Sequence, residues 1–482
     1  MDQRLLDELA GICGADAVLH EPLQLMTYEC DALPHLRSLP AAVVLPSSAS
    51  QVQAVVRACH RAGVPFVARG HGTGLSGGAL PAKDGVVIAL SRLNRVLGVD
   101  IANRRVTVEP GVTNLEITKA VAPHGYYYAP DPSSQQVCSI GGNVAENSGG
   151  AHCLKYGFTV HHVLALEVVL PDGEIANIGS PLVDTPGPDL LGLFVGSEGT
   201  LGIATKIVVR ILRKPESVQT LLAAFDSIDA GGEAVSAIIG AGIIPAAVEM
   251  MDSLAIQAAE AAVHPNFPPS DTILIVELDG PAAEVRSLFQ IVEETCRRVG
   301  ATKIEIAPDD QQRARIWRGR KAAFAAMGRV SPNYYVQDGV VPRTKLPEVL
   351  GKVRDLSIRS GLRIGNVFHA GDGNLHPLIC YDERVPGESD RAVEVAGEIL
   401  RYCVEAGGSI TGEHGVGADK AQYMSQMFTA EDLDAMQRVR LAFDPRNLCN
   451  PRKIFPTPRL CGEVPGPYRA HPAETAGMAE RF

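Results

Sequence analysis

Three glycine-rich blocks interrupt the first half of the chain. They lie at residues 69–78, 131–150 and 196–203, and each also contains serine, threonine or asparagine. Glycine lets a backbone approach a ligand closely, and successive N–H groups can form a concave anion site. Each block alone could be an ordinary turn. Three of them in one half of the chain predict a first domain that binds a phosphate-bearing cofactor.

The first block contains Gly72-Thr-Gly-Leu-Ser-Gly77, which matches the G-x-G-x-x-G pattern of dinucleotide-binding folds. That pattern requires the third glycine to open a helix after a strand. Here Pro81 and Gly85 oppose a helix before the next apolar run. We therefore disfavour a Rossmann fold, and with it a nicotinamide-dependent reductase.

Apolar periodicity predicts an α+β fold. Short apolar runs predict strands at 42–46, 64–68, 86–90, 105–109 and 163–170. Val52, Val55, Val56 and Cys59 recur at helical spacing behind serines that can cap a helix. The glycine clusters end near Pro215. Beyond it, strands such as 272–277 alternate with amphipathic helices such as 282–299, which predicts a second domain.

Bulk properties limit the class of protein. The 482 residues exceed what one core usually supports, so we expect two or three domains. A net charge of −11 argues against a nucleic-acid partner. No apolar run reaches the roughly 18 residues of a membrane helix. The acidic start, Met1 to Glu8, lacks a signal-peptide core, so we expect a cytoplasmic location.

Ten cysteines are scattered without any C-x-x-C pair. This spacing disfavours an iron–sulfur cluster, a zinc ribbon and a thioredoxin-type site. If the protein moves electrons, we expect it to do so without a cluster of its own.

Histidine and glutamate gather in two short motifs of the second half, His369-Ala-Gly-Asp-Gly-Asn-Leu-His376 and Gly412-Glu-His-Gly415. Neutral imidazole and carboxylate are ordinary ligands for Zn²⁺, Mn²⁺ or Fe²⁺. Three such ligands would leave a coordination position open for substrate. Either histidine of the first motif, taken alone, could be an ordinary loop residue. The two motifs together predict a divalent metal site.

These motifs resemble a known family. The first half resembles the vanillyl-alcohol-oxidase-type FAD-binding domain through Arg69–Gly77, Asp131–Asn143 and Gly196–Gly202. The second half resembles FAD-linked D-2-hydroxyacid dehydrogenases through the two motifs above and through Phe443-Asp-Pro…Asn450-Pro. Within that family, the FAD-binding D subunits of bacterial glycolate oxidases are most similar, including the tail around Arg459-Leu-Cys461.

The resemblance implies a domain plan. It comprises a PCMH-type FAD-binding domain of two subdomains over 1–215, with its core at 38–215. A cap domain with a large antiparallel sheet and the metal site follows over 216–425. A C-terminal segment over 426–482 returns to the FAD domain. We expect the Pro- and Gly-rich tail after Pro456 to lie over the surface.

The resemblance also implies the cofactor and its mode of binding. Many relatives attach FAD covalently through a histidine, and Thr73 stands at the matching position, with His71 two residues earlier. We therefore expect non-covalent FAD. The residues expected to bind it are Arg69, Gly70, His71, Gly72, Thr73, Gly74, Ser76, Gly77, Pro132, Ser134, Ser139, Gly142, Asn143, Ser148, Gly149, Glu198, Gly199, Gly202, Ile203 and Asn450.

By the same resemblance, His369, His376 and Glu413 hold Zn²⁺ or Mn²⁺, and His414 is the base that removes the hydroxyl proton. Arg320, shortly after Trp317, matches an arginine that holds the substrate carboxylate; its alternative is a structural salt bridge. Val336 stands where D-2-hydroxyglutarate enzymes have a lysine, which favours a small monocarboxylate.

We therefore expect an FAD-dependent dehydrogenase or oxidase that converts glycolate or D-lactate to the 2-oxo acid. The alternatives are a D-2-hydroxyglutarate dehydrogenase and an FAD-binding scaffold subunit without independent activity. The complete set of metal and base positions argues against the scaffold. The resemblance implies a second FAD-type subunit and an iron–sulfur subunit as electron acceptor, through which the chain would reach the membrane only indirectly.

Overall fold

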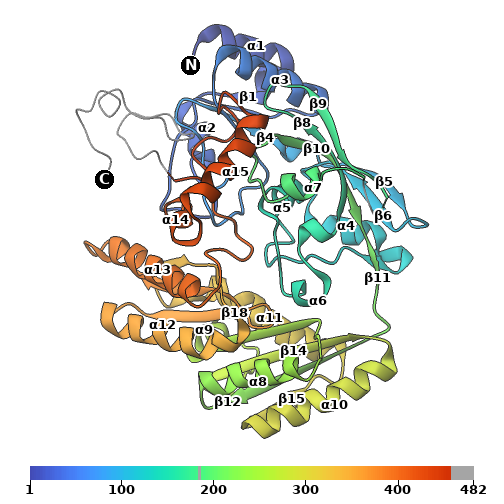
Figure 1. Cartoon of the computed structure of the whole chain (residues 1–482), viewed down its shortest axis with the longest axis vertical. Helices are drawn as coiled ribbons and strands as arrows, with labels where there is room; N and C mark the ends of the chain where they lie inside the picture. The colour runs from blue at the N-terminus through green and yellow to red at the C-terminus, as the bar shows by residue number, and fades with distance from the viewer. Residues whose placement is uncertain (183–185, 457–482) are drawn as a thin grey trace.

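The computed structural model describes residues 1–182 and 186–456. The chain forms two bodies, one above the other in Figure 1, and a cavity lies between them. The upper body contains the first half of the chain together with the last described helices, and the lower body is built on one large sheet. The tail after Pro456, for which a surface position was expected, lies outside the described residues.

The first body opens with a four-stranded sheet in the order β1-β2-β4-β3, in which β2, β4 and β3 are parallel. The strands are β1 (Val18–Leu19), β2 (Ala42–Val44), β3 (Phe66–Arg69) and β4 (Val86–Ala89). Strands β2 and β4 are buried along their length, as apolar parallel strands are when both faces are covered. Helix α3 (Ala49–Ala62) begins where Ser48 accepts the N–H of Gln51, and ends at Gly63 with φ 66°.

A second, five-stranded antiparallel sheet completes this body, in the order β5-β6-β10-β8-β9. It contains β5 (Val96–Asp100), β6 (Arg105–Val108), β8 (Val163–Val169), β9 (Ile175–Gly179) and β10 (Ile203–Arg210). The short helices nearby are α4 (Asn114–Val121), α5 (Ile140–Glu146), α6 (Cys153–Tyr156) and α7 (Leu190–Phe194). The predicted strands are confirmed, as is the arrangement in two subdomains, and β8 and β9 form an antiparallel hairpin.

The second body is a nine-stranded sheet whose pairs are all antiparallel among the described residues. This confirms the expected large antiparallel sheet. Its strands are β12 (Ser217–Phe225), β13 (Ala247–Asp252), β14 (Thr272–Gly280), β15 (Lys303–Ile306), β16 (Asn333–Val336), β17 (Gly339–Val340), β18 (Ile364–His369), β19 (Asn374–Leu375) and β20 (Pro377–Tyr381).

Helices cover both faces of this sheet because its strands are apolar on both sides. On β12, Leu221 and Ala223 pack in one core and Leu222 and Ala224 in another, as the two-residue period of a strand requires. The first core receives α8 (Ile228–Gly240), α10 (Ala282–Val299), α12 (Leu346–Ser360) and α13 (Glu388–Glu405). The second receives α9 (Ser253–Val263) and α11 (Asp310–Ala326), and α11 reaches the cavity between the bodies.

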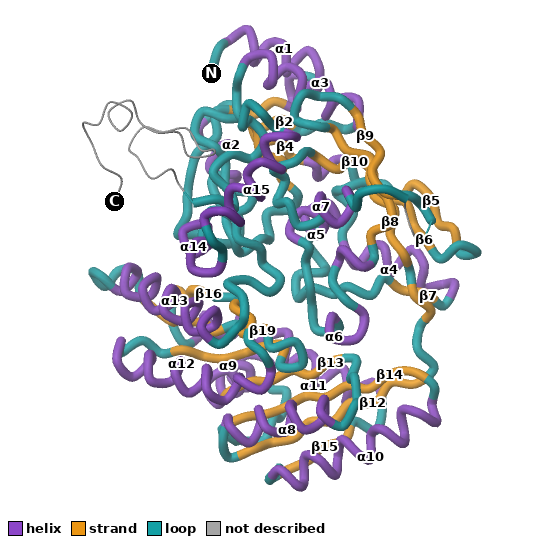
Figure 2. Tube along the Cα trace, in the orientation of Figure 1, coloured by secondary structure: helices purple, strands orange, loops and turns teal. Residues whose placement is uncertain are grey.

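After the large sheet the chain returns to the first body. Helices α14 (Met424–Met427) and α15 (Ala430–Phe443) lie beside the first body in Figure 2. Cys449 then forms a parallel bridge with Phe66 on β3, and the N–H of Asn450 donates to the Phe66 carbonyl at 2.8 Å. No helix among those described is long and apolar enough to cross a membrane.

His152, just before α6, connects the two bodies through a cluster of charged side chains. Its Nδ1 lies 2.9 Å from Asp131 Oδ2 in the first body, and its Nε2 lies 3.3 Å from Glu277 Oε1 on β14. Arg313 on α11 donates twice to the same Glu277 carboxylate, each time at 2.8 Å. Burial favours the neutral imidazole, but the two carboxylates outweigh it and raise the pKa of His152 to about 10.

We expect His152→Gln to lower the free energy of unfolding at pH 7 by about 2 to 3 kcal/mol, because Asp131 loses its cationic partner. The folded-state pKa of about 10 exceeds the unfolded value of about 6.5, so this stabilisation is complete below about pH 6.5 and is lost as the pH rises through 10. Urea unfolding between about pH 6 and pH 10 measures it.

The wild type should lose more stability over this range than His152→Gln does. His124→Gln, which changes an exposed histidine of the same body, is the matched control and should behave as the wild type. Parallel pH profiles for the wild type and His152→Gln would contradict the assignment.

Candidate active site between the two bodies

A cavity of about 640 Å³ separates the two bodies. From the first body, all three glycine-rich blocks line it. From the second body it is lined by the last turn of α11, by residues 332–334 and Val336, and by Glu413 and His414. One space therefore contacts the glycine-rich blocks and the Glu413–His414 motif, whereas His369, His376 and Arg320 lie behind its lining.

Most of the residues expected to bind the cofactor line this cavity. They are Gly70, His71, Gly72, Thr73, Gly74, Pro132, Ser134, Ser139, Gly142, Asn143, Ser148, Gly149, Glu198, Gly199, Gly202, Ile203 and Asn450. Arg69, Ser76 and Gly77 do not line it. Arg69 is buried, with its guanidinium 5.7 Å from the centre of the Tyr28 ring, and Ser76 accepts the N–H of Gly78 at 3.2 Å. Arg69 and Ser76 therefore contact other residues of the protein rather than the cavity.

Two buried side chains hold the loops in place. Asn450 Nδ2 donates to the carbonyls of Gly78, at 2.9 Å, and Glu198, at 2.6 Å, so the C-terminal segment links the first and third blocks. The Glu198 carboxylate accepts the N–H groups of Val416 and Gly417 at 2.7 and 2.6 Å. Burial raises the pKa of Glu198 to about 7, and these two N–H groups oppose the shift. The third block is thereby linked to the loop that carries His414.

His369 ends β18 and faces two carboxylates. Its Nδ1 donates to Glu249 Oε1 at 2.7 Å, and Glu249 lies directly opposite on β13. Its Nε2 lies 3.3 Å from Glu413 Oε1. Burial favours the neutral ring, but Glu249 and Glu413 raise the pKa of His369 well above its ordinary value. The hydrogen bond at Nδ1 leaves Nε2 as the ring nitrogen directed at Glu413.

His376, between β19 and β20, presents its Nε2 to the same carboxylate. The Nδ1 of this ring donates to the Gln337 carbonyl at 3.4 Å, and Nε2 lies 3.0 Å from Glu413 Oε1. Although buried, Nε2 makes no hydrogen bond within the described part of the chain. Burial alone would raise the pKa of Glu413, but the two imidazoles hold it well below its ordinary range.

This arrangement suits a divalent cation. Ligands bound tetrahedrally at 2.0–2.1 Å stand about 3.3 Å apart, close to the 3.0 and 3.3 Å that separate the Glu413 oxygen from the two Nε2 atoms. The hydrogen bonds at both Nδ1 atoms fix each ring with Nε2 pointing inward, as partners of metal-bound histidines do. His369, His376 and Glu413 could therefore hold a metal.

Asp338, between β16 and β17, organises the loop that carries Glu413 and His414. Its Oδ2 accepts the N–H groups of Gly412, Glu413 and His414 at 3.0, 3.2 and 2.8 Å, and the Thr411 hydroxyl at 2.6 Å. Lys420 Nζ lies 3.3 Å from the same oxygen. Burial opposes the ionised form, but His414 and Lys420 outweigh it and hold the pKa of Asp338 far below its ordinary value.

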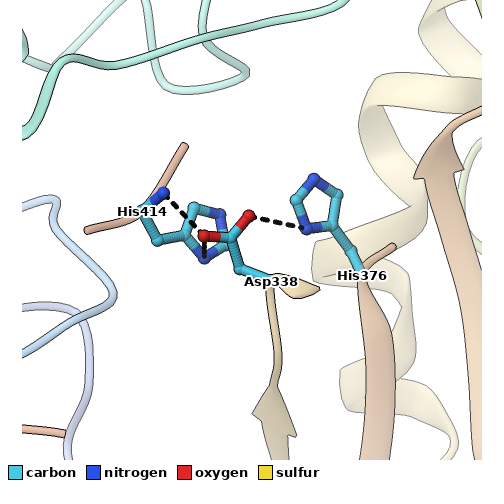
Figure 3. Close-up of side chains that lie close together, drawn as sticks. All are labelled: Asp338, His376 and His414. Carbon is cyan, nitrogen blue, oxygen red and sulfur yellow. Dashed lines mark hydrogen bonds and ion pairs between the residues drawn. The ribbon is translucent and has the colours of Figure 1, made fainter. Parts of the chain in front are cut away.

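Figure 3 shows the Asp338 carboxylate between the imidazoles of His376 and His414. Its oxygens lie 3.9 Å from His376 Nδ1 and 4.0 Å from His414 Nδ1, so these three side chains form a second group with ligand-like spacing. The Asp338 oxygen nearest His414 already accepts several donors. The group of His369, His376 and Glu413 is therefore the better candidate for a metal.

Arg320 on α11 is buried beside this group. Its Nη2 lies 2.5 Å from Glu249 Oε2, the carboxylate that also accepts from His369. The contact lacks hydrogen-bond geometry, and Nε and Nη2 of Arg320 donate no hydrogen bond within the described part of the chain. Arg320 thus forms the structural ion pair that the sequence left as its alternative role, and its Nε is the buried N–H group that remains suited to an anionic ligand.

Sequence reasoning missed the residues that orient the others. Asp338, Glu249 and Lys420 are each at most 1 % exposed, yet none belongs to a recognisable motif. The only signal for Glu249 is a carboxylate inside the apolar run of β13. Asp338 carries no local signal, because the groups that donate hydrogen bonds to it all lie beyond residue 410.

Two family models match the chain. One, described as an FAD binding domain, matches residues 40–179, and the other, described as the C-terminal domain of FAD linked oxidases, matches residues 214–454. Glycolate oxidase subunit GlcD of Escherichia coli K12 is 49% identical over 96% of this chain and 93% of its own length. The subunit GlcD of Bacillus subtilis 168 is 40% identical over 89% of this chain and 92% of its own length. A D-lactate dehydrogenase of Anaerostipes hadrus is 31% identical over 87% of this chain and 90% of its own length.

Solved structures share the fold. The 4-ethylphenol oxidase of Gulosibacter chungangensis superposes with a TM-score of 0.78 at 19% identity, over 95% of this chain and 97% of that one. A p-cresol methylhydroxylase superposes with a TM-score of 0.79 at 18% identity, over 94% and 96%. These likenesses confirm the two-subdomain FAD-binding architecture and the sheet-based second body.

Proposed function

Because this chain belongs to the FAD-linked oxidases of the vanillyl-alcohol-oxidase type, we propose that it is a flavoprotein that oxidises a small 2-hydroxy acid, glycolate or D-lactate, to the 2-oxo acid. The glycolate oxidase subunits and the D-lactate dehydrogenase among its relatives support this substrate class. The observation that carries the proposal is that Glu413 and His414 line the same cavity as the glycine-rich loops.

His369, His376 and Glu413 are proposed to hold a divalent metal, Zn²⁺ or Mn²⁺, which when bound would lower the pKa of the substrate hydroxyl. The support is the convergence of two buried Nε2 atoms on one carboxylate oxygen. His414 is proposed to take the hydroxyl proton. Burial lowers its pKa to about 4, and the Asp338 charge opposes this, so the ring is neutral near pH 7 and can accept a proton.

Arg320 is proposed to pair with the substrate carboxylate through Nε, which makes no hydrogen bond within the described part of the chain, while its Nη2 keeps the ion pair with Glu249. FAD, when bound, supplies the acceptor for the two electrons released at Cα. The chain's own side chains then have separate tasks, since Arg320 holds the acid and His414 removes its proton. Val336 lines the cavity and offers no cation for a second carboxylate at its position, which favours glycolate or D-lactate over D-2-hydroxyglutarate, although Lys321 lines the same cavity.

The test is anaerobic reduction of the FAD-loaded chain by glycolate, D-lactate, L-lactate and D-2-hydroxyglutarate, each with and without a chelator. Bleaching of the flavin band near 450 nm (roughly, for any flavin) by glycolate or D-lactate is the expected result. A flavin that remains oxidised with every acid would overturn the proposal and favour a scaffold subunit without independent activity.

FAD is expected to bind without a covalent bond, because Thr73 offers no imidazole and the nearby His71 uses Nδ1 to donate to the Val137 carbonyl at 2.5 Å. Acid precipitation should leave yellow FAD in the supernatant, from the wild type and from His71→Ala alike. Flavin fluorescence retained in the wild-type pellet, and lost from the His71→Ala pellet, would show a bond through His71.

Electrons are proposed to leave through partner chains, namely a second FAD-type subunit and an iron–sulfur subunit, which would also bring this chain to the membrane. The support is that the relatives in E. coli and B. subtilis are named as subunits. The isolated chain should therefore reduce artificial dyes slowly and react poorly with oxygen. Co-expression with the partner chains should yield a complex with full turnover. A lone chain that turns over rapidly with oxygen and releases stoichiometric peroxide would contradict this.

A further inference from the structure

Phe324, in the last turn of α11, lines the cavity that contains the proposed substrate site. It follows Arg320 by one helical turn, so both side chains lie on the same face of the helix. The Arg320 guanidinium carbon lies 5.8 Å from the centre of the Phe324 ring. The ring also meets His376 edge-on, with centroids 5.7 Å apart. Phe324 therefore contacts both the proposed carboxylate anchor and a proposed metal ligand.

The burial of Arg320 and His376 shows that Phe324 lies between the cavity and both side chains. The side chain of Arg320 is 3% exposed and that of His376 is 1% exposed, and neither lines the cavity. Phe324 contacts both and does line the cavity. A ligand that enters from the cavity and reaches the guanidinium must therefore lie against this ring.

The surroundings leave the ring little freedom to move aside. Phe324 packs at the edge of the core between α9, α11 and the large sheet, beside Val336. Packed cores resist enlargement, because inserting even a few methylene groups forces strained rotamers or backbone shifts. Phe324 itself is partly buried, and its packing against this core limits how far the ring can move aside.

We propose that Phe324 sets the upper limit on the size of the substituent at Cα of the substrate, so that the site accepts hydrogen or methyl and rejects longer or branched groups. This inference rests on the proposed function and names the specificity residue of that site. An acid held by its carboxylate at Arg320 has its Cα only one bond further along. Its substituent therefore falls within reach of the ring.

Anaerobic flavin reduction by a graded series of acids tests this. The substrates are glycolate, D-lactate, D-2-hydroxybutyrate and D-2-hydroxy-3-methylbutyrate, and the proteins are the FAD-loaded wild type, Phe324→Leu and Phe324→Ala. The readout is the second-order rate constant for each acid divided by that for glycolate. One methylene in an apolar pocket is worth about 10- to 200-fold, so this ratio for the four- and five-carbon acids should rise at least about tenfold in Phe324→Ala and less in Phe324→Leu.

Phe289→Leu is the matched control, because Phe289 is a buried phenylalanine of the same body on α10, outside the cavity. It should cost stability without changing the ratios. If Phe324→Ala fails to fold, Phe324→Leu alone decides, since leucine is still the smaller side chain. Suppose that the variants bind FAD and are reduced by glycolate, but their rate ratios stay within about twofold of the wild-type ratios. This result would overturn the inference about Phe324 and leave the proposed function intact. A wild-type flavin that no acid reduces would overturn the proposed function as well.

Discussion

Replacement of His414 by alanine is expected to lower the maximal rate of flavin reduction by a factor of roughly 10² to 10⁴, the usual contribution of a positioned general base. The ring lines the cavity beside Glu413, and burial keeps it neutral near pH 7 by lowering its pKa to about 4. The variant loses the proton acceptor alone. Asp338 binds the backbone N–H groups of the loop, and these remain when the side chain is removed.

The affinity for the 2-hydroxy acid should therefore change little, and the flavin spectrum should match that of the wild type. Stopped-flow reduction at several acid concentrations separates the limiting rate from the dissociation constant. His60→Ala, on α3 of the first body, controls for the loss of a histidine far from the cavity. A limiting rate near that of the wild type in His414→Ala would exclude this imidazole as the base.

The fold was predictable to the extent that its signals are local. Apolar runs such as 86–90 and 272–277 predict buried strands, and β4 and β14 occupy them. The end of the glycine clusters near Pro215 lies just before β12, the first strand of the large sheet. The order of strands was not predictable in this way, since β13 pairs with β18 across more than a hundred residues of intervening chain.

Only those residues of the site that lie together in a short sequence motif were predictable. His369 and His376 stand out because glycines and two imidazoles occur together, and Glu413 with His414 because glycines flank them. Glu249 faces His369 only through the register of two strands that are distant in sequence. Asp338 acts through backbone N–H groups, and a backbone donor leaves no trace in the identity of the residue that carries it.

Arg69 is a case in which the sequence motif was misleading. It belongs to a motif that predicts ligand binding, but its side chain does not line the cavity. As the first residue of the first glycine-rich block, Arg69 was expected to bind FAD. The structure buries it near Tyr28 and Asp31, outside the lining of the cavity. Nothing in the block itself distinguishes these positions, because residues 28–31 belong to a separate segment.

Removal of the proposed metal is expected to lower the rate of substrate oxidation by at least about 100-fold, because a cation at the hydroxyl would stabilise the transition state by several kcal/mol. Dialysis against a chelator, checked by elemental analysis, should give a metal-free protein that retains FAD. FAD stays because the loops at 70–74 and 196–203 do not depend on His369 or His376. Zn²⁺ or Mn²⁺ should restore the rate, and restoration should weaken at low pH, since imidazole must be unprotonated to bind a metal.

Glu413→Gln removes the one carboxylate on which both Nε2 atoms converge and should lower metal affinity while leaving FAD bound. Glu405→Gln, at the exposed end of α13, is the matched control for loss of a carboxylate. In the wild type, one metal ion per chain should appear in elemental analysis, and in Glu413→Gln substantially less. Full activity in a preparation shown to contain no metal would remove the cation from the mechanism and leave His369, His376 and Glu413 as a hydrogen-bonded structural cluster.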